Sequence, residues 1–219
     1  MCANGRNALL VGGSGRVARL TTPLLQAAGF AITSVIRDKD RVPDIEELGA
    51  APLIQDVTRA NRKTWEALLD GMDVVVWTAG VGGPEGTGCC PAVDRDAVIT
   101  LIDALDGIAY PARFLTVGYA GPVTAPAASF SAAKRAVGKR LQLSSLEDAA
   151  VLGPTTLSDD PARGIMLLDV ENPSLPRNCS PTTSRELLAR VIAELAGRPQ
   201  TLGRTRLHFS DGDGQIAAL

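Results

Sequence analysis

Residues 8–18 read ALLVGGSGRVA, and this stretch decides the fold. The run from Ala8 to Val11 is continuously apolar, which is typical of a strand buried on both faces, and it stops at a glycine-rich turn. A stripe of apolar residues at helical spacing follows and ends at Gly29; it comprises Val17, Leu20, Leu24, Leu25 and Ala28. The stretch therefore predicts a strand, a tight turn and a helix in direct succession.

The same alternation of strand and helix continues along the chain. Strands are expected at 31–36, 52–54, 73–78, 113–117, 149–152 and 165–168, and helices around 44–48, 61–70, 97–105, 131–143 and 187–195. Because parallel neighbours need a helical crossover, the pattern predicts a doubly wound parallel sheet in a three-layer α/β/α arrangement. Thr183 and Glu186 have the spacing of a capping box for the last helix. The chain after the strand at 149–152 has room for two strands, a helix and a tail.

Composition favours one globular domain over residues 1–219. The chain is 45% apolar and 21% charged, and its net charge of −2 and 4% aromatic content do not favour a nucleic-acid binder. No apolar run approaches the roughly 18 residues that cross a bilayer, and the start lacks a signal-peptide cleavage pattern. We therefore expect a cytoplasmic protein with a small-molecule substrate and no nucleic-acid or membrane partner; a homodimer is compatible with the sequence.

The cysteines and the single histidine do not predict a metal site. Cys2, Cys89, Cys90 and Cys179 show no CxxC spacing, and His208 stands alone. A bridge between the adjacent Cys89 and Cys90 would strain the backbone, so both are interpreted as ordinary thiols.

Gly12-x-x-Gly15-x-x-Ala18 lies between the first strand and the first helix, which is where a dinucleotide-binding fingerprint belongs. Gly12 would allow the tight turn, Gly15 would let the backbone approach a pyrophosphate, and Ala18 would let the helix pack closely on the sheet. The helix N-terminus would then offer N–H groups to the phosphates. The sequence thus predicts a Rossmann-type NAD(P)-binding fold.

The end of the second strand indicates which dinucleotide is preferred. Arg37 follows the strand at once and could bind a 2′-phosphate, and Arg16 in the glycine loop could add a second cation. These residues predict NADP(H) over NAD(H). Should the strand run one residue further, Asp38 would face the ribose instead and Arg37 would be a solvated surface charge.

These motifs resemble the atypical, NmrA-like NAD(P)-binding group of the short-chain dehydrogenase/reductase superfamily, whose members often carry the label NAD(P)-dependent epimerase/dehydratase. The resemblance covers nearly the whole chain: LLVGGSGRVA at 9–18, VIRD at 35–38, QDV at 55–57, TAG at 78–80, VDRD at 93–96, SAAKR at 131–135, GP at 153–154, LSDDP at 157–161, SRE at 184–186 and TLG at 201–203. It implies that Asp56 and Val57 contact the adenine, Ala79 and Gly80 the ribose and phosphates, and Lys134 the nicotinamide ribose. The other expected cofactor contacts are Gly13, Ser14, Val17, Thr78, Val117 and Pro154.

The catalytic pattern of that superfamily is incomplete in this chain. Phe130 stands four residues before Lys134, at the position where the family has the tyrosine that acts as general acid. Gly118 replaces the family's serine, and Asp94 replaces its asparagine. Carbonyl reduction needs a proton donor worth about 10²- to 10⁴-fold in rate. Tyr119 could supply a hydroxyl, or it is an ordinary half-buried loop tyrosine; Lys134 could likewise be a solvated helix lysine, and Asp94 a helix N-cap.

Three functions remain open. The first is an NADPH-dependent oxidoreductase whose small, rather apolar acceptor, such as a flavin, quinone or ketone, needs no acid from the usual serine and tyrosine. The second is a non-catalytic, NmrA-like dinucleotide sensor, and the third is an epimerase or dehydratase. The substrate region is expected from about residue 153 onward, together with loops 81–91 and 119–130, with walls poor in charge.

Overall fold

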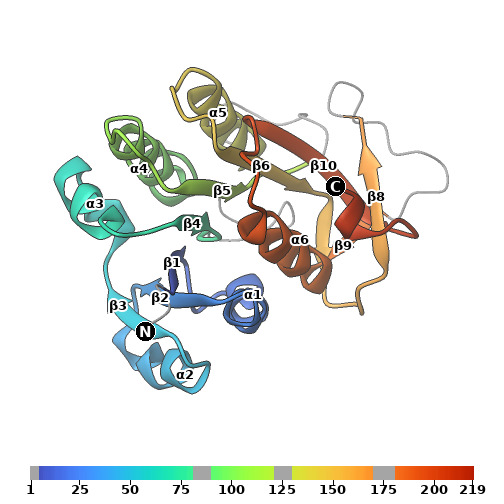
Figure 1. The fold of residues 1–219 in the computed structure, drawn as a ribbon, viewed down its shortest axis with the longest axis horizontal. Coiled ribbons are helices and arrows are strands. Elements are labelled where there is room, and N and C mark those ends of the chain that lie inside the picture. The colour runs from blue at the N-terminus through green and yellow to red at the C-terminus, as the bar shows by residue number, and fades with distance from the viewer. Residues whose placement is uncertain (1–4, 81–89, 121–129, 170–180) are drawn as a thin grey trace.

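The computed structural model describes residues 5–80, 90–120, 130–169 and 181–219. Within these ranges eight strands form one sheet in the order β3-β2-β1-β4-β5-β6-β10-β8 (Figure 1). The strands are β1 Arg6–Val11, β2 Phe30–Ile36, β3 Ala51–Ile54, β4 Val74–Trp77, β5 Arg113–Val117, β6 Ala149–Pro154, β8 Gly164–Leu168 and β10 Thr205–Gly212. All neighbours pair in parallel except β8, which is antiparallel to β10.

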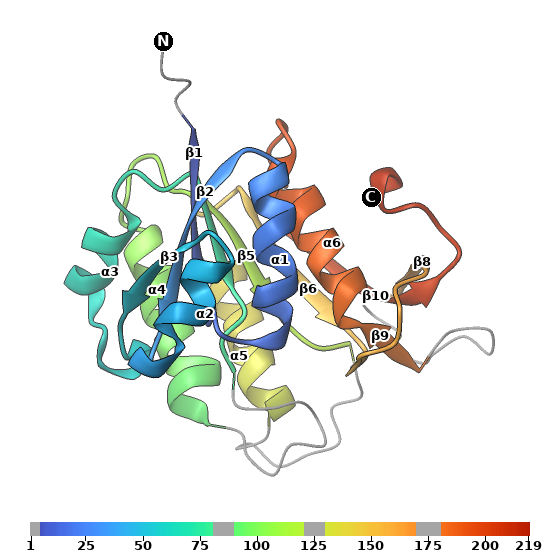
Figure 2. The same ribbon diagram turned by 90° about the horizontal axis from the view of Figure 1, so that it is seen from below.

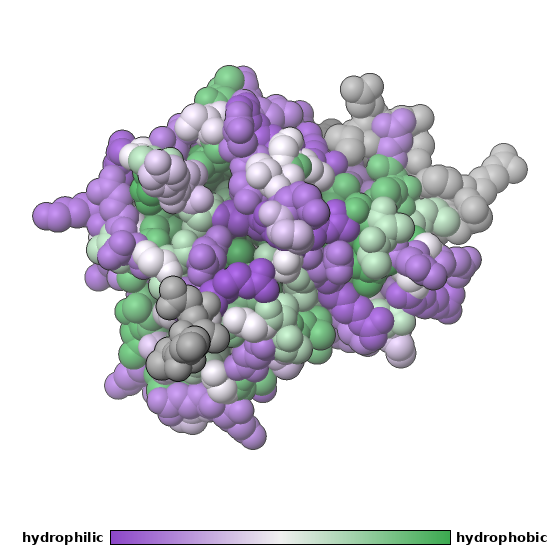
Figure 3. Space-filling view, viewed as in Figure 1, coloured by the Kyte–Doolittle hydropathy of each residue, from purple (hydrophilic) through white to green (hydrophobic). Residues whose placement is uncertain are grey.

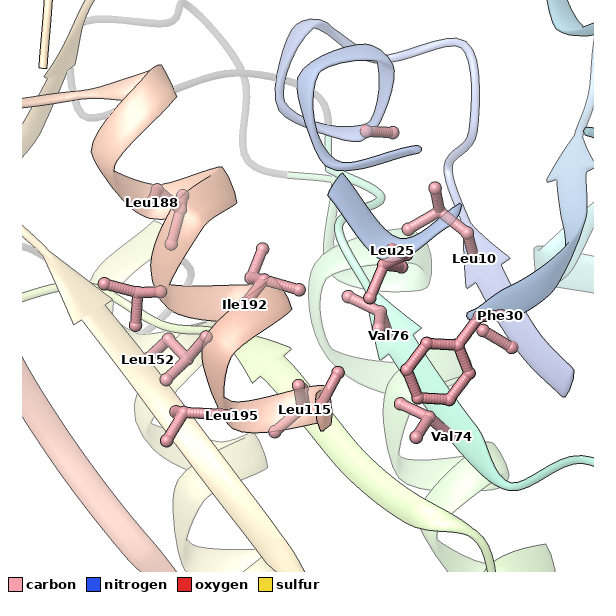
Figure 4. Close-up of a cluster of buried hydrophobic side chains, with 14 of the residues drawn as sticks. Leu10, Leu25, Phe30, Val74, Val76, Leu115, Leu152, Leu188, Ile192 and Leu195 are labelled. Carbon is pink, nitrogen blue, oxygen red and sulfur yellow. The ribbon is translucent and has the colours of Figure 1, made fainter. Parts of the chain in front are cut away.

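Helices cover both faces of this sheet, as the alternating pattern predicted (Figure 2). The helices are α1 Arg16–Ala27, α2 Val42–Glu47, α3 Arg62–Leu69, α4 Ala97–Leu105, α5 Phe130–Gln142 and α6 Arg185–Gly197. The side chains of β1 alternate between two cores: Ala8 and Leu10 pack toward α1 and α6, while Leu9 and Val11 pack toward α3, α4 and α5. Figure 4 shows the first core, where Leu25 of α1 and Ile192 of α6 meet the sheet. The three-layer α/β/α prediction is therefore confirmed.

The region after β6 is richer in strands than expected. Its described part contains four strands instead of two, because β7 (Thr156–Ser158) pairs with β9 (Thr182–Ser184) in a small second sheet and β10 occupies the expected tail. The predicted parallel sheet has one exception, the edge strand β8, which pairs antiparallel with β10.

The expected capping box at the start of α6 was also wrong. Ser184 is the N-cap and its side chain accepts from the Leu187 N–H. The Thr183 hydroxyl instead donates to the Phe209 carbonyl at 3.1 Å, and Glu186 accepts from the Ala162 N–H at 3.0 Å. Both side chains therefore hold other parts of the chain after β6 rather than the helix end.

Hydrophilic and hydrophobic residues are interspersed over the face seen in Figure 3, and one of the hydrophobic patches lies on the side that carries β8. Leu167 of β8 is 55% exposed. In the described ranges no helix has both the length and the apolar character needed to cross a membrane.

Arg113, at the start of β5, holds the far end of α6. Its guanidinium is 7% exposed, pairs with Asp148 at 2.9 Å and donates to the carbonyls of Leu195, Arg198 and Gln200 at 2.6–2.7 Å. The last turn of α6 has no basic residue of its own, so Arg113 supplies the positive charge that the carbonyl end of the helix favours. One side chain thus links the middle of the sheet to the C-terminal end of α6.

We expect Arg113→Met to lower the free energy of unfolding by about 3 kcal/mol or more, because it leaves a partly buried carboxylate and several carbonyls without their donor. Arg41→Met is the control, since Arg41 is in an exposed pair with Asp44 and its loss should cost less than about 1 kcal/mol. Urea denaturation of both variants measures the difference, and equal midpoints would contradict the role given to Arg113.

Candidate functional site

A cleft opens at the carboxyl ends of β1 and β4, where the strand order reverses. It consists of two adjoining cavities of about 200 and about 530 Å³ that share Gly15, Thr78, Ala79 and Gly80. The smaller, here called the β2 half, is also lined by Gly12, Ser14, Val35, Ile36, Arg37, Gln55, Asp56, Val57 and Val93. The larger, the β5 half, is also lined by Arg16, Val17, Ala18, Val117, Gly118, Tyr119, Phe130, Lys134, Pro154, Thr155, Thr156, Leu157 and Arg185.

The glycine turn forms the floor between the two halves. Gly12 has φ +89°, the left-handed conformation that favours glycine, and a Cβ there would lie 2.7 Å from the backbone of Ala79. The N–H groups of Gly12 and Gly13 both donate to the Val35 carbonyl at 3.0 Å. Gly12 therefore adopts the tight turn that the sequence predicted and lets β1 and β4 approach each other closely.

The N-terminus of α1 fits a phosphate group. Gly15 is its N-cap and provides no side-chain cap, and the first turn carries no acidic residue. Among the described residues, a Cβ on Gly15, whose φ is −70°, would meet only the Gly12 carbonyl oxygen, at 3.1 Å, so these residues leave space above the loop. Uncapped N–H groups at a helix start attract anions, and these residues fit the pyrophosphate of a dinucleotide. Ala18 is fully buried beneath them.

In the β2 half, Arg37 follows the last residue of β2 and is exposed on the cleft wall. Asp38 is turned away, since its carboxylate caps the next turn by accepting from the Asp40 N–H at 3.0 Å. Arg16 lies in the other half and pairs with Asp159 at 2.6 Å, so the structure does not bring it to Arg37 as the second cation that the sequence suggested. Arg37 alone of the two arginines lines this half of the cleft.

Asp56 and Val57 also lie in the β2 half, where the resemblance places them. The Asp56 carboxylate accepts from the Thr58 hydroxyl at 2.7 Å and from the Thr58 N–H at 3.0 Å. These hydrogen bonds hold the pKa of Asp56 below its usual range. At neutral pH the site therefore presents a hydrogen-bond acceptor, which suits an amino or hydroxyl group rather than a phosphate.

The β5 half contains a buried ion pair. Lys134 Nζ lies 3.4 Å from Asp94 Oδ1, and the two side chains are 9% and 0% exposed. Asp94 sits in a π-helical turn over Ala92–Asp96 and its other oxygen accepts from the Cys90 N–H at 3.2 Å. Lys134 is therefore no solvated helix lysine, and Asp94 is no helix N-cap, because it reaches back from inside the turn. π-Helical turns of this kind recur at functional sites.

An aromatic pair lines the same half. The rings of Tyr119 and Phe130 meet edge to face with centroids 5.9 Å apart, and Lys134 Nζ lies 5.3 Å from the Phe130 centroid. Phe130 thus lies beside Lys134, in the position where the family has its general-acid tyrosine. At Gly118 a Cβ would lie 2.9 Å from Val151 Cγ1, so a serine there would need Val151 to shift. The described part of the cleft therefore lacks both usual proton donors and retains the half-buried Tyr119.

Some predicted features lie outside the described residues: Cys2, Cys89, Cys179 and most of loops 81–91 and 119–130. Cys90 is a free, half-buried thiol. Among the residues that are described, no three His, Cys, Asp or Glu side chains come together as metal ligands. Sequence reasoning missed Arg185, the first residue of α6, which lines the β5 half together with Arg16. Its place in the resembling SRE motif was the available signal.

The strand order, the glycine turn and the uncapped helix start define a dinucleotide-binding α/β protein. The sequence model of the NAD(P)H-binding family matches residues 12–199, and the chain belongs to this family. This agrees with the resemblance to the atypical short-chain dehydrogenase/reductases.

Individual relatives are distant. The UPF0659 protein C216.03 of Schizosaccharomyces pombe is 31% identical over 99 residues, which are 44% of this chain and 40% of that protein. A Bacillus halodurans protein provisionally named an NAD-dependent epimerase/dehydratase superposes with a TM-score of 0.80 at 24% identity, covering 98% of both chains. ChuY, an anaerobillin reductase of Escherichia coli O157:H7, gives 0.71 at 23% identity, over 94% of this chain and 98% of that one. These structures share the fold.

We expect Gly15→Val to abolish dinucleotide binding while the protein stays folded, because the new side chain fills the open space above the loop at an ordinary φ. Gly12→Val should differ, since its positive φ and the contact with Ala79 make it a folding defect. Circular dichroism and a nucleotide titration separate the two. A folded Gly15→Val protein that binds normally would show that the loop is only a turn.

Proposed function

We propose that this protein is an NADP(H)-dependent oxidoreductase that transfers hydride to a small planar acceptor, such as a flavin or quinone, without an acid from the usual serine and tyrosine. The observation that carries the proposal is the junction of two half-clefts at Gly15 and Thr78–Gly80, one with dinucleotide-binding features and one with an aromatic wall. Such a junction suits a cofactor in one half and an acceptor in the other.

NADPH, when bound, would supply the hydride. The protein would hold the cofactor, orient it toward the acceptor and shield both from water. The uncapped start of α1 would hold the pyrophosphate, and Lys134, kept in place by Asp94, would hydrogen-bond the nicotinamide ribose. Tyr119 and Phe130 would stack or pack against a planar acceptor and exclude water from it. The ion pair with the buried Asp94 fixes the position of the Lys134 ammonium group.

The absence of the usual acid at 118 and 130 supports the choice of acceptor. A flavin or quinone can accept a hydride and later take its proton from water, whereas a ketone needs the proton as the alkoxide forms. An epimerase or dehydratase of this superfamily leans on the same tyrosine, so Phe130 disfavours that reading. The reductase activity named for one structural neighbour fits the redox proposal.

For the cofactor we expect NADP(H) to bind about ten- to a hundredfold more tightly than NAD(H), because Arg37 can donate charge-assisted bonds to a 2′-phosphate. Arg37→Ala should remove that preference. Arg41→Ala is the matched control, since Arg41 lies on the next turn, pairs with Asp44 and does not line the cleft. Fluorescence titration with both nucleotides measures the ratio of the NADP(H) and NAD(H) affinities. Equal affinities in the unmodified protein would refute the predicted preference for NADP(H).

For the acceptor we expect NADPH oxidation with flavins or quinones and little with ketones. Phe130→Tyr should create or raise ketone reduction, by up to about 10²-fold, because it restores a hydroxyl one turn before Lys134. Absorbance at the NADPH band follows both reactions.

Three outcomes change the conclusion. No turnover with any acceptor despite tight NADPH binding favours the non-catalytic sensor. Ketone reduction that disappears in Tyr119→Phe, but not in Tyr110→Phe, shows that Tyr119 is the proton donor; Tyr110 is 95% exposed and serves as the control. Turnover of a nucleotide sugar would favour the epimerase or dehydratase.

A further inference from the structure

Three charged side chains meet at the edge of the β5 half. Asp159, just beyond β7, bridges Arg16 at 2.6 Å and Arg185 at 2.7 Å. The arginines are the first residues of α1 and α6, which lie side by side on one face of the sheet (Figures 1 and 2). The two guanidinium groups thus share one carboxylate, and each arginine lies at the N-terminus of its helix.

Arg185 is built into the wall rather than lying on the surface. Its side chain is 13% exposed, whereas those of Arg16 and Asp159 are 67% and 64% exposed. Among the described residues its guanidinium donates a hydrogen bond only to Asp159, although the group has five N–H donors. A cation in the first turn of a helix is also unfavourable with respect to the helix dipole. A largely buried cation in an unfavourable place, with spare donors beside a cavity, points to a ligand.

We propose that Arg185, assisted by Arg16, binds an anionic oxygen group of the acceptor, a carboxylate or phosphate, and that Asp159 occupies these donors until the acceptor displaces it. The proposal deepens the proposed function and rests on it, because it names the acceptor class as planar and anionic. Arg185 shares its cavity with Tyr119 and Phe130, so the acceptor's ring and its anionic group can occupy the same half of the cleft.

The dinucleotide pyrophosphate is the other source of such a group. Arg185 lines the half that also contains Thr155, Thr156 and Leu157, and it does not line the half that contains Arg37 and Asp56. The uncapped start of α1 already offers N–H groups to the pyrophosphate. The position of Arg185 therefore favours the acceptor, and a separate measurement of NADP⁺ affinity tests the choice.

The experiment compares FMN with riboflavin, which differ by a phosphate. Flavin fluorescence is titrated with the full chain saturated with NADP⁺. We expect FMN to bind at least about tenfold more tightly than riboflavin. In Arg185→Gln the ratio of the two dissociation constants should fall to near one. Arg190→Gln is the matched control, because Arg190 lies on the same helix, pairs with Glu186 and faces away from the cleft; it should keep the ratio.

The direction in which Asp159→Asn changes the affinity for FMN separates the anion site from a merely structural bridge. Removing the competing carboxylate should strengthen FMN binding several-fold and leave riboflavin binding little changed. A merely structural bridge would instead make Asp159→Asn and Arg185→Gln weaken binding alike, and this would overturn the proposal. A preference for FMN that survives Arg185→Gln would overturn it too, as would a loss confined to NADP⁺ affinity, which would assign Arg185 to the pyrophosphate.

Failure of the proposed function is distinguishable from failure of this site. Should neither flavin bind, flavin reduction is excluded. Inorganic phosphate titrated into the NADP⁺-loaded, ¹⁵N-labelled chain then still tests whether Arg185 binds an anion. A saturable shift of the Arg185 Nε–H signal, identified by its loss in Arg185→Gln and enhanced in Asp159→Asn, would support the anion site. No shift would refute it.

Discussion

The close approach of the turn after β1 to Ala79, two residues beyond β4, is the constraint on which the rest of the structure depends. Gly12 can lie against the Ala79 backbone only because it lacks a Cβ and adopts a positive φ. This contact lets the two central strands end at the same level, so that α1 begins at the point where the strand order reverses. The cleft, the open helix end and the junction of its two halves all follow from it.

Charge and aromatic packing together shape the chemistry of the β5 half. A buried lysine needs a partner, and Asp94 provides it from a turn that a π-helical distortion carries toward α5. The same lysine contacts the face of Phe130, so the residue that replaces the family's acid still helps to position it. The described part of the site therefore has phenylalanine in place of the family's tyrosine and a fixed lysine where the resemblance implies a cofactor contact.

The segment after β6 is held by buried polar contacts rather than by apolar packing alone. Thr155 and Thr183 share a hydrogen bond at 2.8 Å, and Asp211 of β10 accepts from the Ser184 N–H and hydroxyl. Because buried polar groups are costly unless paired, this network gives β7 and β9 one arrangement against the main sheet. It thereby sets the positions of Leu157, Asp159 and Arg185 around the cleft.

Much of the fold could be predicted from the sequence, because residues that are close together in the chain determine it. The apolar run 8–11, the glycine turn and the helical stripe after it needed no distant partner, and the positions of Gly12, Gly15, Arg37 and Asp56 at strand ends followed from the strand pattern. The three-residue strands β7 and β9 and the eight-residue strand β10 did not follow. Very short strands and a mixed polar tail carry little periodicity, and pairing stabilises them. Likewise, only the tertiary structure decided that Lys134 is buried against Asp94, that Thr183 bonds β10 instead of capping α6, and that Arg16 meets Asp159 and not Arg37. Direction and burial of a side chain depend on elements that lie far away in the chain, and residues 16 and 159 become neighbours only when the sheet has formed.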